Sequence, residues 1–465
     1  MIGWIPRERE KACGFSVEKY GPQQATDEWA PDCGNGIAPD GTRITGNDPT
    51  DTSIPAGADY VADWVEYLTG KYGTAEDGGV AYYNLDNEPD IWHETHRDVH
   101  PEGASYDEIR DAAYEIAGAI KEVDPSAQTL GPTGWGWNSI FMSGLDQKTC
   151  NEEGGSCWSN PPDRAAHGGV PFAEWYLAQL AAYEEETGQR ILDYYDNHWY
   201  PQGTGVASGS DDPAAQELRL RSPRQLWDPE YVDESWINEP VALIPRMREL
   251  VEENYPGTKI GISEYNYGAL DTVNGALAQA DVLGIFGREG LDLATLWAPP
   301  QATDPGAYAF RMYLNYDGEG SGFGDIAIPA SSDDPDQVGV YAAERSEDGA
   351  LTLMVVNKSQ TDLTVPLYLA GADRGAVAAE VYQYGEADPT AISRLADQRL
   401  VDGQATLDLP ANSITELVVP GDESVCDAVP TVADSAPAPA RIPAADAAEP
   451  AAGVRPVVDV ATRRN

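Results

Sequence analysis

The amino-acid sequence predicts an α/β protein, a (β/α)8 barrel followed by an antiparallel β-sandwich. In roughly the first 300 residues, segments with helical periodicity alternate with short apolar segments, the order expected of βαβ units around a parallel sheet. Most of the apolar segments end in acidic or aromatic residues, which suits barrel strands that deliver side chains to a functional rim. After Asp325 the sequence changes to short β-branched runs separated by Gly, Asp and Asn turns, as in a β-sandwich.

The helix and strand assignments rest on periodicity. Between Gly57 and Tyr72 apolar residues recur at helical spacing, and this segment leads into a short apolar strand that ends at Glu88. The same pattern then repeats four times. Predicted helices at residues 105–123, 172–187, 239–255 and 272–289 each precede a predicted strand, at residues 129–135, 191–201, 259–265 and 293–299 respectively. This alternation favours βαβ units arranged around one parallel sheet.

Counting the strands leaves the predicted barrel incomplete. Met1–Ile5 is a sixth strand-like segment, whereas a closed barrel of this kind needs eight strands. We therefore expect the first two strands to be missing, through an N-terminal truncation or a wrongly assigned start codon. Two missing strands leave unpaired edges and exposed barrel interior, which costs more than the ~5–15 kcal/mol net stability of an ordinary domain. This chain is accordingly expected to be poorly soluble or inactive by itself.

The domain organisation predicted from these patterns has three parts: a barrel over residues 1–325, a β-sandwich over residues 326–420 and a tail over residues 421–465. Strands of the sandwich are predicted at residues 338–344, 350–357, 363–369, 379–384, 404–409 and 413–419. The tail is rich in Ala, Pro and Asp and has almost no aromatic residues, so it cannot bury a core. We expect a disordered tail, or a linker to a further module.

Composition restricts the class of partner. The chain has 465 residues, and Lys+Arg 29 against Asp+Glu 78 gives a formal net charge of −49. Such a charge repels nucleic acid and anionic membranes, and no apolar run approaches the roughly 20 residues that cross a bilayer. A neutral partner is the natural inference, and we expect a monomer. The acidic surface is compatible with a secreted protein that must stay soluble. The composition does not distinguish a halophilic protein from an ordinary acidic extracellular one.

The N-terminus and the cysteines leave the compartment open. The start MIGWIPRERE lacks the order of charged, apolar and small residues that marks a signal peptide. Of the five cysteines, Cys13/Cys33 and Cys150/Cys157 are near enough in sequence to close loops in an oxidising compartment, with Cys426 left over. Free thiols are an equal alternative. With no Cys/His spacing typical of zinc and only five histidines, imidazole-based metal chemistry is not expected.

Two carboxylates are the candidate catalytic residues. Glu88 ends the predicted strand Tyr82–Glu88, which Pro89 stops, while Glu264 lies at the corresponding end of a later strand, in ISEYNYG. Two carboxylates that face each other across a barrel mouth form the minimal machine for hydrolysing a glycosidic bond. Either tripeptide alone occurs by chance. Both together, on strand ends separated by three βα units, are a strong signal.

Aromatic residues supply a second line of argument. They cluster at or just beyond the predicted strand ends, where flat rings stack on the apolar faces of sugar units. The residues concerned are Trp4, Trp92, Trp135, Trp137, Trp199, Tyr200 and Trp297. For any single tryptophan, packing in a core or a loop is the better explanation. For the group we favour a platform for a neutral polysaccharide.

The motif YYNLDNEPDIWHETHRDVHP, together with GPTGWGW, DNHWYPQ, ISEYNYG and LWAP, resembles glycoside hydrolase family 44 from residue 1 to about residue 420. These endoglucanases belong to the large clan of retaining (β/α)8 glycosidases and join the barrel to a β-sandwich. The resemblance implies cleavage of internal β-1,4-glucosidic bonds in soluble cellulose derivatives, with xyloglucan, lichenan, xylan or mannan also accepted by some members. A β-xylanase or mannanase of the same clan, or a non-catalytic carbohydrate-binding remnant, are the alternatives.

The resemblance also assigns roles to individual residues. It makes Glu88 the general acid/base and Glu264 the nucleophile. Asn87 would hydrogen-bond the 2-hydroxyl of the reacting sugar, and His198 and Tyr200 would line the cleft beside the nucleophile. Tyr265 joins the aromatic residues in the predicted substrate-binding set.

Members of the family have an additional N-terminal segment that supplies the first two barrel strands, and Met1–Trp4 aligns with the third strand. The resemblance therefore implies secretion, with the signal peptide lost together with that segment. No cofactor is required for the chemistry. The family is associated with bound metal, for which we expect structural Ca²⁺, and acidic loops such as Asp27–Asp32 are candidate ligands. Because an acidic loop is more often simply solvated, no metal site is assigned.

Overall fold

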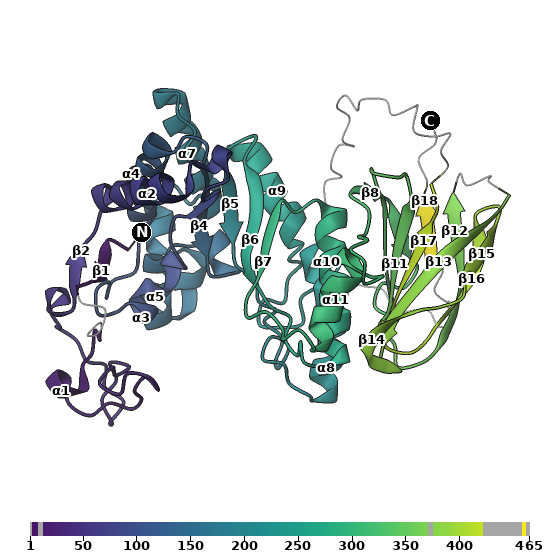
Figure 1. Ribbon diagram of the computed structural model, residues 1–465. Helices are drawn as coiled ribbons and strands as arrows, with labels where there is room; N and C mark the ends of the chain where they lie inside the picture. Colours follow the sequence, from purple (N-terminus) through teal and green to yellow (C-terminus); the bar gives the residue numbers. More distant parts are fainter. Residues whose placement is uncertain (1, 8–12, 371–374, 422–457, 462–465) are drawn as a thin grey trace. The chain divides into compact units, whose positions relative to one another are not determined.

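The structure is a computed structural model that describes residues 2–7, 13–370, 375–421 and 458–461 (Figure 1). The chain divides into two compact units. The first comprises residues 1–200, 243–265 and 291–297, and the second comprises residues 201–242, 266–290 and 298–465. These units cut across the boundary predicted at residue 325, because two segments that precede it in sequence belong to the same unit as the β-sandwich.

The centre of the first unit is a parallel sheet. Its strands are β3 (Tyr82–Asn84), β4 (Gln128–Gly134), β5 (Tyr194–Asn197), β6 (Lys259–Tyr265) and β7 (Leu293–Leu296), and each pairs in parallel with the next in that order. The predicted α/β class and all five of these strands are confirmed. Within the described residues the sheet is open, with β3 and β7 at its edges.

Four long helices accompany these strands (Figure 1). They are α2 (Ala58–Tyr72), α4 (Tyr106–Val123), α7 (Phe172–Thr187) and α9 (Leu243–Asn254). Helix α2 precedes β3, while α4, α7 and α9 each lie between two successive strands in the chain, and each helix contacts the next. Helix α4 shows why they form where the sequence predicts. Ser105 caps its N-terminus by accepting a hydrogen bond from the Glu108 amide, and Ile109, Ile116 and Ile120 form its buried stripe.

The first strand differs from its prediction. Strand β1 (Trp4–Pro6) pairs antiparallel with β2 (Ser53–Pro55) in a separate two-stranded sheet, with Ile5 opposite Ile54. Assigning Met1–Ile5 to the parallel sheet was therefore wrong. A run of a few apolar residues has no period that identifies its partner, so the pairing was decided by a segment about fifty residues away in the chain.

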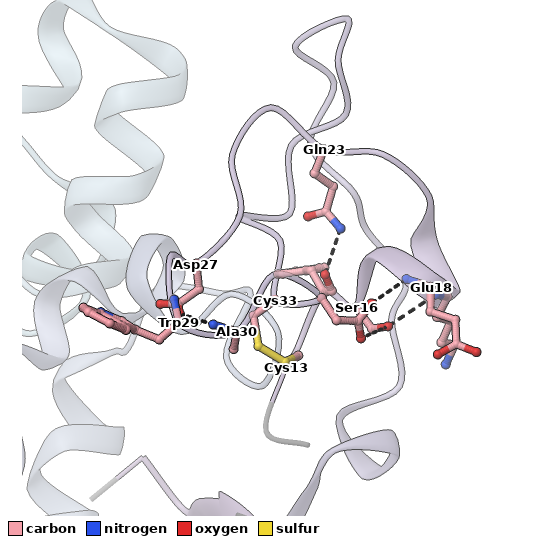
Figure 2. Close-up of a disulfide and its surroundings, with 11 residues drawn as sticks. Cys13, Ser16, Glu18, Gln23, Asp27, Trp29, Ala30 and Cys33 are labelled. Carbon is pink, nitrogen blue, oxygen red and sulfur yellow. Dashed lines mark hydrogen bonds between the residues drawn. A yellow bond between two sulfur atoms is a disulfide. The ribbon is translucent and has the colours of Figure 1, made fainter. Parts of the chain in front are cut away.

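The loop between β1 and β2 carries a disulfide. Cys13 pairs with Cys33, and Figure 2 shows the turn beside it, in which one Asp27 carboxylate oxygen accepts hydrogen bonds from the amides of Trp29 and Ala30. A second disulfide joins Cys150 to Cys157. Both pairings that the sequence left open are thus present in the structure, and Cys426 lies outside the described residues.

Several short helices complete the first unit. The short α-helices are α1 (Val17–Tyr20), α3 (Trp92–Thr95), α5 (Gly144–Glu153) and α6 (Pro162–Ala166). Single 3-10 turns occur at η1 (Pro49–Asp51), η2 (Ala75–Asp77), η3 (Pro89–Ile91), η4 (Asn138–Ile140) and η5 (Gly155–Ser159). Helix α3 and turn η3 directly follow the segment that carries Glu88, so the chain there is folded tightly rather than extended.

The second unit contains the β-sandwich, in which two antiparallel sheets share one long strand, β13 (Ala376–Gly385). Residues 376–379 pair with β15 (Gln398–Val401), and residues 380–385 pair with β17 (Ser413–Val419). The other strands are β8 (Ile326–Ile328), β9 (Ala330–Ser332), β10 (Val338–Glu344), β11 (Leu351–Asn357), β12 (Leu363–Ala370), β14 (Asp388–Arg394), β16 (Gln404–Leu409) and β18 (Val458–Ala461). One apolar cluster from both sheets forms the core, as the alternating pattern predicts.

Strand β18 lies within the segment predicted to be a disordered tail. Its backbone pairs in parallel with β12 and antiparallel with β9. Residues 422–457 and 462–465 lie outside the described residues, so the prediction for the remainder of the tail stands as made.

Helices α8 (Pro213–Arg221), α10 (Val273–Glu289) and α11 (Pro305–Leu314) and the 3-10 turn η6 (Ser222–Leu226) also belong to the second unit. A buried ion pair joins α10 to the sandwich. The Asp281 carboxylate accepts hydrogen bonds from Lys358 Nζ at 2.8 Å and from the Tyr341 hydroxyl at 2.6 Å. In the part of the chain that the structure describes, no helix combines the length and apolar character needed to span a membrane.

Candidate active site

Glu88 is presented by the turn that follows β3. The amide of Glu88 donates to the Thr133 carbonyl oxygen at 2.9 Å, which ties the turn to the end of β4. Glu88 itself has a left-handed backbone with φ 49°, and the 3-10 turn η3 begins at Pro89. A residue with a side chain in this region costs about 1–3 kcal/mol, and such residues cluster at functional sites. The conformation allows the chain to reverse immediately after the carboxylate.

Glu264 lies near the end of β6 and is held through both its backbone and its side chain. Its carbonyl oxygen accepts a hydrogen bond from the Trp199 amide at 2.9 Å. Its Oε2 accepts one from the Tyr200 hydroxyl, also at 2.9 Å. Burial, followed by the contact with Glu264, raises the pKa of Tyr200 well above its usual range, so that the hydroxyl stays a donor. The Glu88 and Glu264 side chains are 16% and 18% exposed, which leaves both accessible to a ligand.

His198 stands between the two carboxylates. Its Nδ1 lies 2.9 Å from Glu88 Oε1 and 3.5 Å from Glu264 Oε2, and its ring is almost fully buried. Burial lowers the pKa of His198, but the hydrogen bond to Glu88 and the negative charges of Asp196 and Glu264 outweigh it, so the pKa is raised. These contacts make His198 easier to protonate than a free histidine, and its Nδ1 lies where it can donate a proton to Glu88 Oε1.

The arrangement suits carboxylate chemistry better than metal binding. The side chains of Glu88, His198 and Glu264 each offer one ligand atom, and these three atoms lie within 4.8 Å of one another. This spacing is also compatible with a bound cation. However, a metal ligand must be a neutral imidazole, and the raised pKa of His198 means that a metal ion competes with a proton more strongly here than at a free histidine. Two carboxylates at this separation match the paired acids that act on opposite sides of a glycosidic bond.

Asp90 is a buried residue of the site that sequence reasoning missed. It is 2% exposed, and its carboxylate accepts hydrogen bonds from the Trp135 amide at 3.0 Å and from Gln147 Nε2 at 3.1 Å. Burial, opposed by these bonds, raises the pKa of Asp90 to about 6. By holding the Trp135 backbone, Asp90 fixes one of the predicted sugar-binding rings. Its position two residues after Glu88 was the available signal.

The predicted aromatic platform divides according to burial. Trp135 and Trp297 are 45% and 58% exposed, and each directly follows a strand of the parallel sheet. The Trp297 amide donates to the Tyr265 carbonyl oxygen at 3.0 Å. Trp137 is half-buried beneath the Arg246 guanidinium, 5.1 Å from its ring. Trp135 and Trp297 therefore remain the strongest candidates for stacking on sugar.

Other predicted platform residues are not placed to bind a ligand. Trp92 and Tyr265 are each 2% exposed, and Trp199 is also buried, so their rings contact protein on both faces. The Trp92 indole N–H donates to the Asn87 carbonyl oxygen at 2.9 Å, which supports the turn before Glu88. We correct the assignment of Trp92 and Tyr265 from substrate binding to packing. Alternation along a strand does not reveal which strand-end ring is covered.

Two further predicted contacts have different outcomes. Asn87 is exposed beside Glu88, where its side chain is accessible to a ligand, and its predicted bond to a sugar hydroxyl stays a prediction. Trp4 is half-buried on β1, in the separate two-stranded sheet. His198 and Tyr200, in contrast, contact the candidate catalytic carboxylates directly, as expected.

The acidic loop at residues 27–32 does not fit a Ca²⁺ site. Asp27 Oδ1 is already the acceptor for two amides of its own turn (Figure 2). Both oxygens of Asp32 accept hydrogen bonds, from the Ser16 hydroxyl at 2.7 Å and from the Glu18 amide at 2.7 Å. Calcium takes six to eight oxygen ligands, whereas these carboxylates serve to fold the loop. The loop is therefore structural.

Paired carboxylates at the ends of parallel strands in an α/β fold define the glycoside hydrolase class of site. The model of glycoside hydrolase family 44 matches residues 1–203. The crystal structure of CelM2, a bifunctional glucanase-xylanase from a metagenome library, is 44% identical with a TM-score of 0.86, and the match covers 90% of this chain and 81% of that one. The chain belongs to glycoside hydrolase family 44.

Two further relatives show the range of the family. A Paenibacillus polymyxa xyloglucanase of the family, solved with xyloglucan, is 29% identical with a TM-score of 0.70, over 78% of this chain and 70% of that one. Endoglucanase A of Paenibacillus lautus is 32% identical over 376 residues, 78% of this chain. The chain spans 52% of the length of that endoglucanase.

Proposed function

We propose that this chain hydrolyses internal β-1,4-glucosidic bonds of cellulose-type glucans or xyloglucan, with retention of configuration at the anomeric carbon. The observation that carries the proposal is the convergence of Glu88 and Glu264, whose nearest ligand atoms lie within 4.8 Å and share His198 as a neighbour. Retaining enzymes hold their carboxyl groups about 5–5.5 Å apart, and inverting enzymes about 6.5–9.5 Å. The shorter separation supports double displacement.

In the first step, Glu264 attacks the anomeric carbon while the bond from that carbon to the leaving oxygen breaks. The proton of Glu88 passes to the leaving oxygen, and a glycosyl ester forms on Glu264. Because the Tyr200 hydroxyl and His198 Nδ1 both lie beside Glu264 Oε2, the other oxygen, Oε1, is the attacking atom. In the second step water attacks the anomeric carbon and gives a proton to Glu88, while the bond from that carbon to the Glu264 oxygen breaks. This step restores the Glu264 carboxylate and the protonated Glu88.

A neutral polysaccharide is the substrate class that the surface supports. The net charge of −49 disfavours anionic polymers, and the exposed rings of Trp135 and Trp297 offer faces for pyranose units. CelM2 is described as a glucanase-xylanase, and the P. polymyxa relative binds xyloglucan. Xylan is therefore the second candidate substrate. Initial rates on hydroxyethylcellulose, which is uncharged, and on xyloglucan, xylan and mannan rank these polymers directly.

The test of the proposed mechanism removes each carboxylate in turn. Glu264→Ala loses roughly 10⁴-fold or more in kcat, and Glu88→Gln roughly 10²–10⁴-fold on substrates whose leaving group needs a proton. Azide restores turnover of Glu264→Ala and gives a glycosyl azide of inverted configuration. Glu102→Gln is the matched control, because Glu102 is 78% exposed in an ion pair with Lys148 outside the site.

Two results would contradict the proposal. Wild-type-like activity in Glu264→Ala would show that the nucleophile is elsewhere. Binding of cello-oligosaccharides by the unmodified protein without release of reducing ends would favour the non-catalytic carbohydrate-binding alternative. The product anomer, followed by NMR during hydrolysis, separates retention from inversion independently of any variant.

We also propose that the protein works in an oxidising extracellular setting. The disulfides Cys13–Cys33 and Cys150–Cys157 support this, since such bonds persist outside the reducing cytosol. Thiol titration of the denatured, unreduced protein then detects one cysteine for each chain, Cys426, and five after reduction. Detection of five thiols before reduction would contradict the proposal.

A further inference from the structure

The hydrogen-bond ladder between β5 and β6 is interrupted beside the candidate nucleophile. The two strands are in register from Tyr194 and Lys259 to Asp196 and Gly261, and pairing resumes only at Trp199 and Tyr265. In the interval the chain stays paired with β4, with Asn197 opposite Gly134 and the His198 amide donating to the Gly134 carbonyl oxygen at 2.7 Å. The register between β6 and β7 also shifts between Ile262 and Tyr265. Glu264 therefore lies in a stretch where the regular ladder is lost on both sides.

The side chain of Asp196 bridges this interruption. Asp196 is completely buried, and its Oδ1 accepts a hydrogen bond from the Ser263 amide at 2.8 Å. Its Oδ2 accepts a second bond from the Ser263 hydroxyl at 2.5 Å. The carboxylate thus binds the residue immediately before Glu264 at two points, in place of the missing ladder bonds.

The contact continues to the strand ends on the other side of the site. The Thr133 hydroxyl donates to Asn84 Oδ1 at 2.5 Å, and Asn84 Nδ2 lies 3.4 Å from the Ser263 hydroxyl oxygen. Each group donates toward the next, and the series ends on the Asp196 carboxylate. The ends of β3, β4, β5 and β6 are therefore connected below Glu88 and Glu264.

We propose that Asp196 is a positioning residue, which fixes the Glu264 carboxylate for attack through its two hydrogen bonds to Ser263. The proposal rests on the proposed function, in which Glu264 is the nucleophile. Nucleophilic attack requires the reacting atoms to be held closely, and a misplacement of about 1 Å costs roughly 10²-fold in rate. The interrupted strand ladder does not provide that accuracy, and the Tyr200 hydroxyl holds only one oxygen of the partly exposed Glu264 carboxylate.

The primary test compares two substitutions of Asp196. Asp196→Ala removes both bonds, and we expect kcat to fall roughly 10²-fold with KM within about twofold. Asp196→Asn restores most of kcat, because the amide oxygen accepts from the Ser263 amide while the amide nitrogen donates to its hydroxyl. If the negative charge rather than the geometry were responsible, Asn and Ala would lose the same activity, and the proposal would be overturned.

A matched control lies at the other end of the same strand. Asp193 accepts hydrogen bonds from Lys121 Nζ and from the Thr129 amide, both at 2.7 Å. Asp193→Ala lowers thermal stability but leaves kcat unchanged, since it touches none of the site. Should Asp196→Ala fail to fold, Ser263→Ala serves instead. It removes the hydroxyl's contacts with Asp196 and Asn84 but keeps the bond from the Ser263 amide to Asp196, and we expect a several-fold fall in kcat at constant KM. An unchanged kcat in Ser263→Ala would contradict the proposal.

A double-mutant cycle separates positioning from general support of the site. In the Glu264→Gly variant, added azide takes the place of the missing carboxylate as the nucleophile. If Asp196 acts by positioning Glu264, the rate that azide restores should not depend on Asp196. We expect Asp196→Ala to leave that rescued rate within about twofold. An equal loss in both backgrounds would overturn the inference while leaving the proposed function intact. An inactive unmodified protein would overturn the proposed function and, with it, this role for Asp196.

Discussion

At the scale of single residues, burial separates carboxylates with different tasks. Glu88 and Glu264 are partly exposed and hydrogen-bonded, as groups that meet a substrate must be. Asp196 is fully buried but receives two hydrogen bonds from Ser263. Glu416 on β17 is also fully buried, yet among the residues that the structure describes neither of its carboxyl oxygens has a hydrogen-bond partner. This last group is a liability for stability.

Glu416 makes the unfolding free energy depend on pH. Burial raises the pKa of Glu416 well above its usual range, so the folded state retains a proton that the unfolded state releases. The penalty is absent below about pH 4 and grows as pH rises toward the folded pKa. We therefore expect Glu416→Gln to raise the unfolding free energy by about 1–3 kcal/mol at pH 8 and to leave it unchanged at pH 4. Urea unfolding at both values measures this. Equal effects at the two pH values would show that Glu416 ionises normally.

Residue-scale prediction from sequence succeeded where chemistry requires a residue type. Glu88, Glu264, His198 and Tyr200 were recognisable from their motifs, and the structure brings them together. Asp196 was not recognised, although it lies two residues before His198. The role of Asp196 depends on the point at which the pairing of β5 with β6 is interrupted. The periodicity of apolar residues in the sequence does not indicate where such an interruption occurs.

At the scale of elements, the long helices and the strands of the parallel sheet lie within a few residues of their predicted limits. Helix α4 begins one residue after Ser105, whose capping bond is a local property of the sequence. Loop structure was not predicted in the same way. Residues 13–50 fold around a disulfide and are held to the segment after Glu88 by the ion pair of Arg43 with Glu94, at 2.7 Å.

The disulfide Cys13–Cys33 is expected to stabilise this loop. It joins residues 20 positions apart, and closing a loop of that size contributes about 3 kcal/mol in the chain-entropy model. The double variant Cys13→Ser/Cys33→Ser should therefore become sensitive to limited proteolysis within residues 13–50 and unfold at lower urea. Cys150→Ser/Cys157→Ser is the matched control, since its loop spans only 7 positions and lies elsewhere. Proteolysis at the same rate in both variants would contradict a specific role for the first disulfide.

At the scale of the whole molecule, charge dominates. The net charge is −49. Buried ion pairs such as Lys121–Asp193 and Lys358–Asp281 neutralise only a few of the acidic side chains. Mutual repulsion opposes the compact state more than the expanded unfolded state. The same field repels anionic polymers and leaves neutral polysaccharides as the compatible partners.

Salt should accordingly stabilise the folded protein. Raising NaCl from 0.01 M to 0.15 M shortens the Debye length from about 30 Å to about 8 Å, which screens repulsion between distant carboxylates. We expect the melting temperature to rise steeply over this range and to level off above it. Sucrose of equal osmolality is the control, because it does not screen charge. A melting temperature that is constant or falls with NaCl would show that local ion pairs outweigh the net repulsion.

By itself, the sequence determined the fold class, the order of helices and strands, the two candidate catalytic carboxylates and the family, since these depend on local periodicity and short motifs. Tertiary structure alone decided which rings are covered, as for Trp92 and Tyr265, and which segment pairs with Trp4–Pro6. It also placed Asp196 beneath Glu264. These features depend on contacts between residues far apart in the chain, and burial and register arise only when those residues meet.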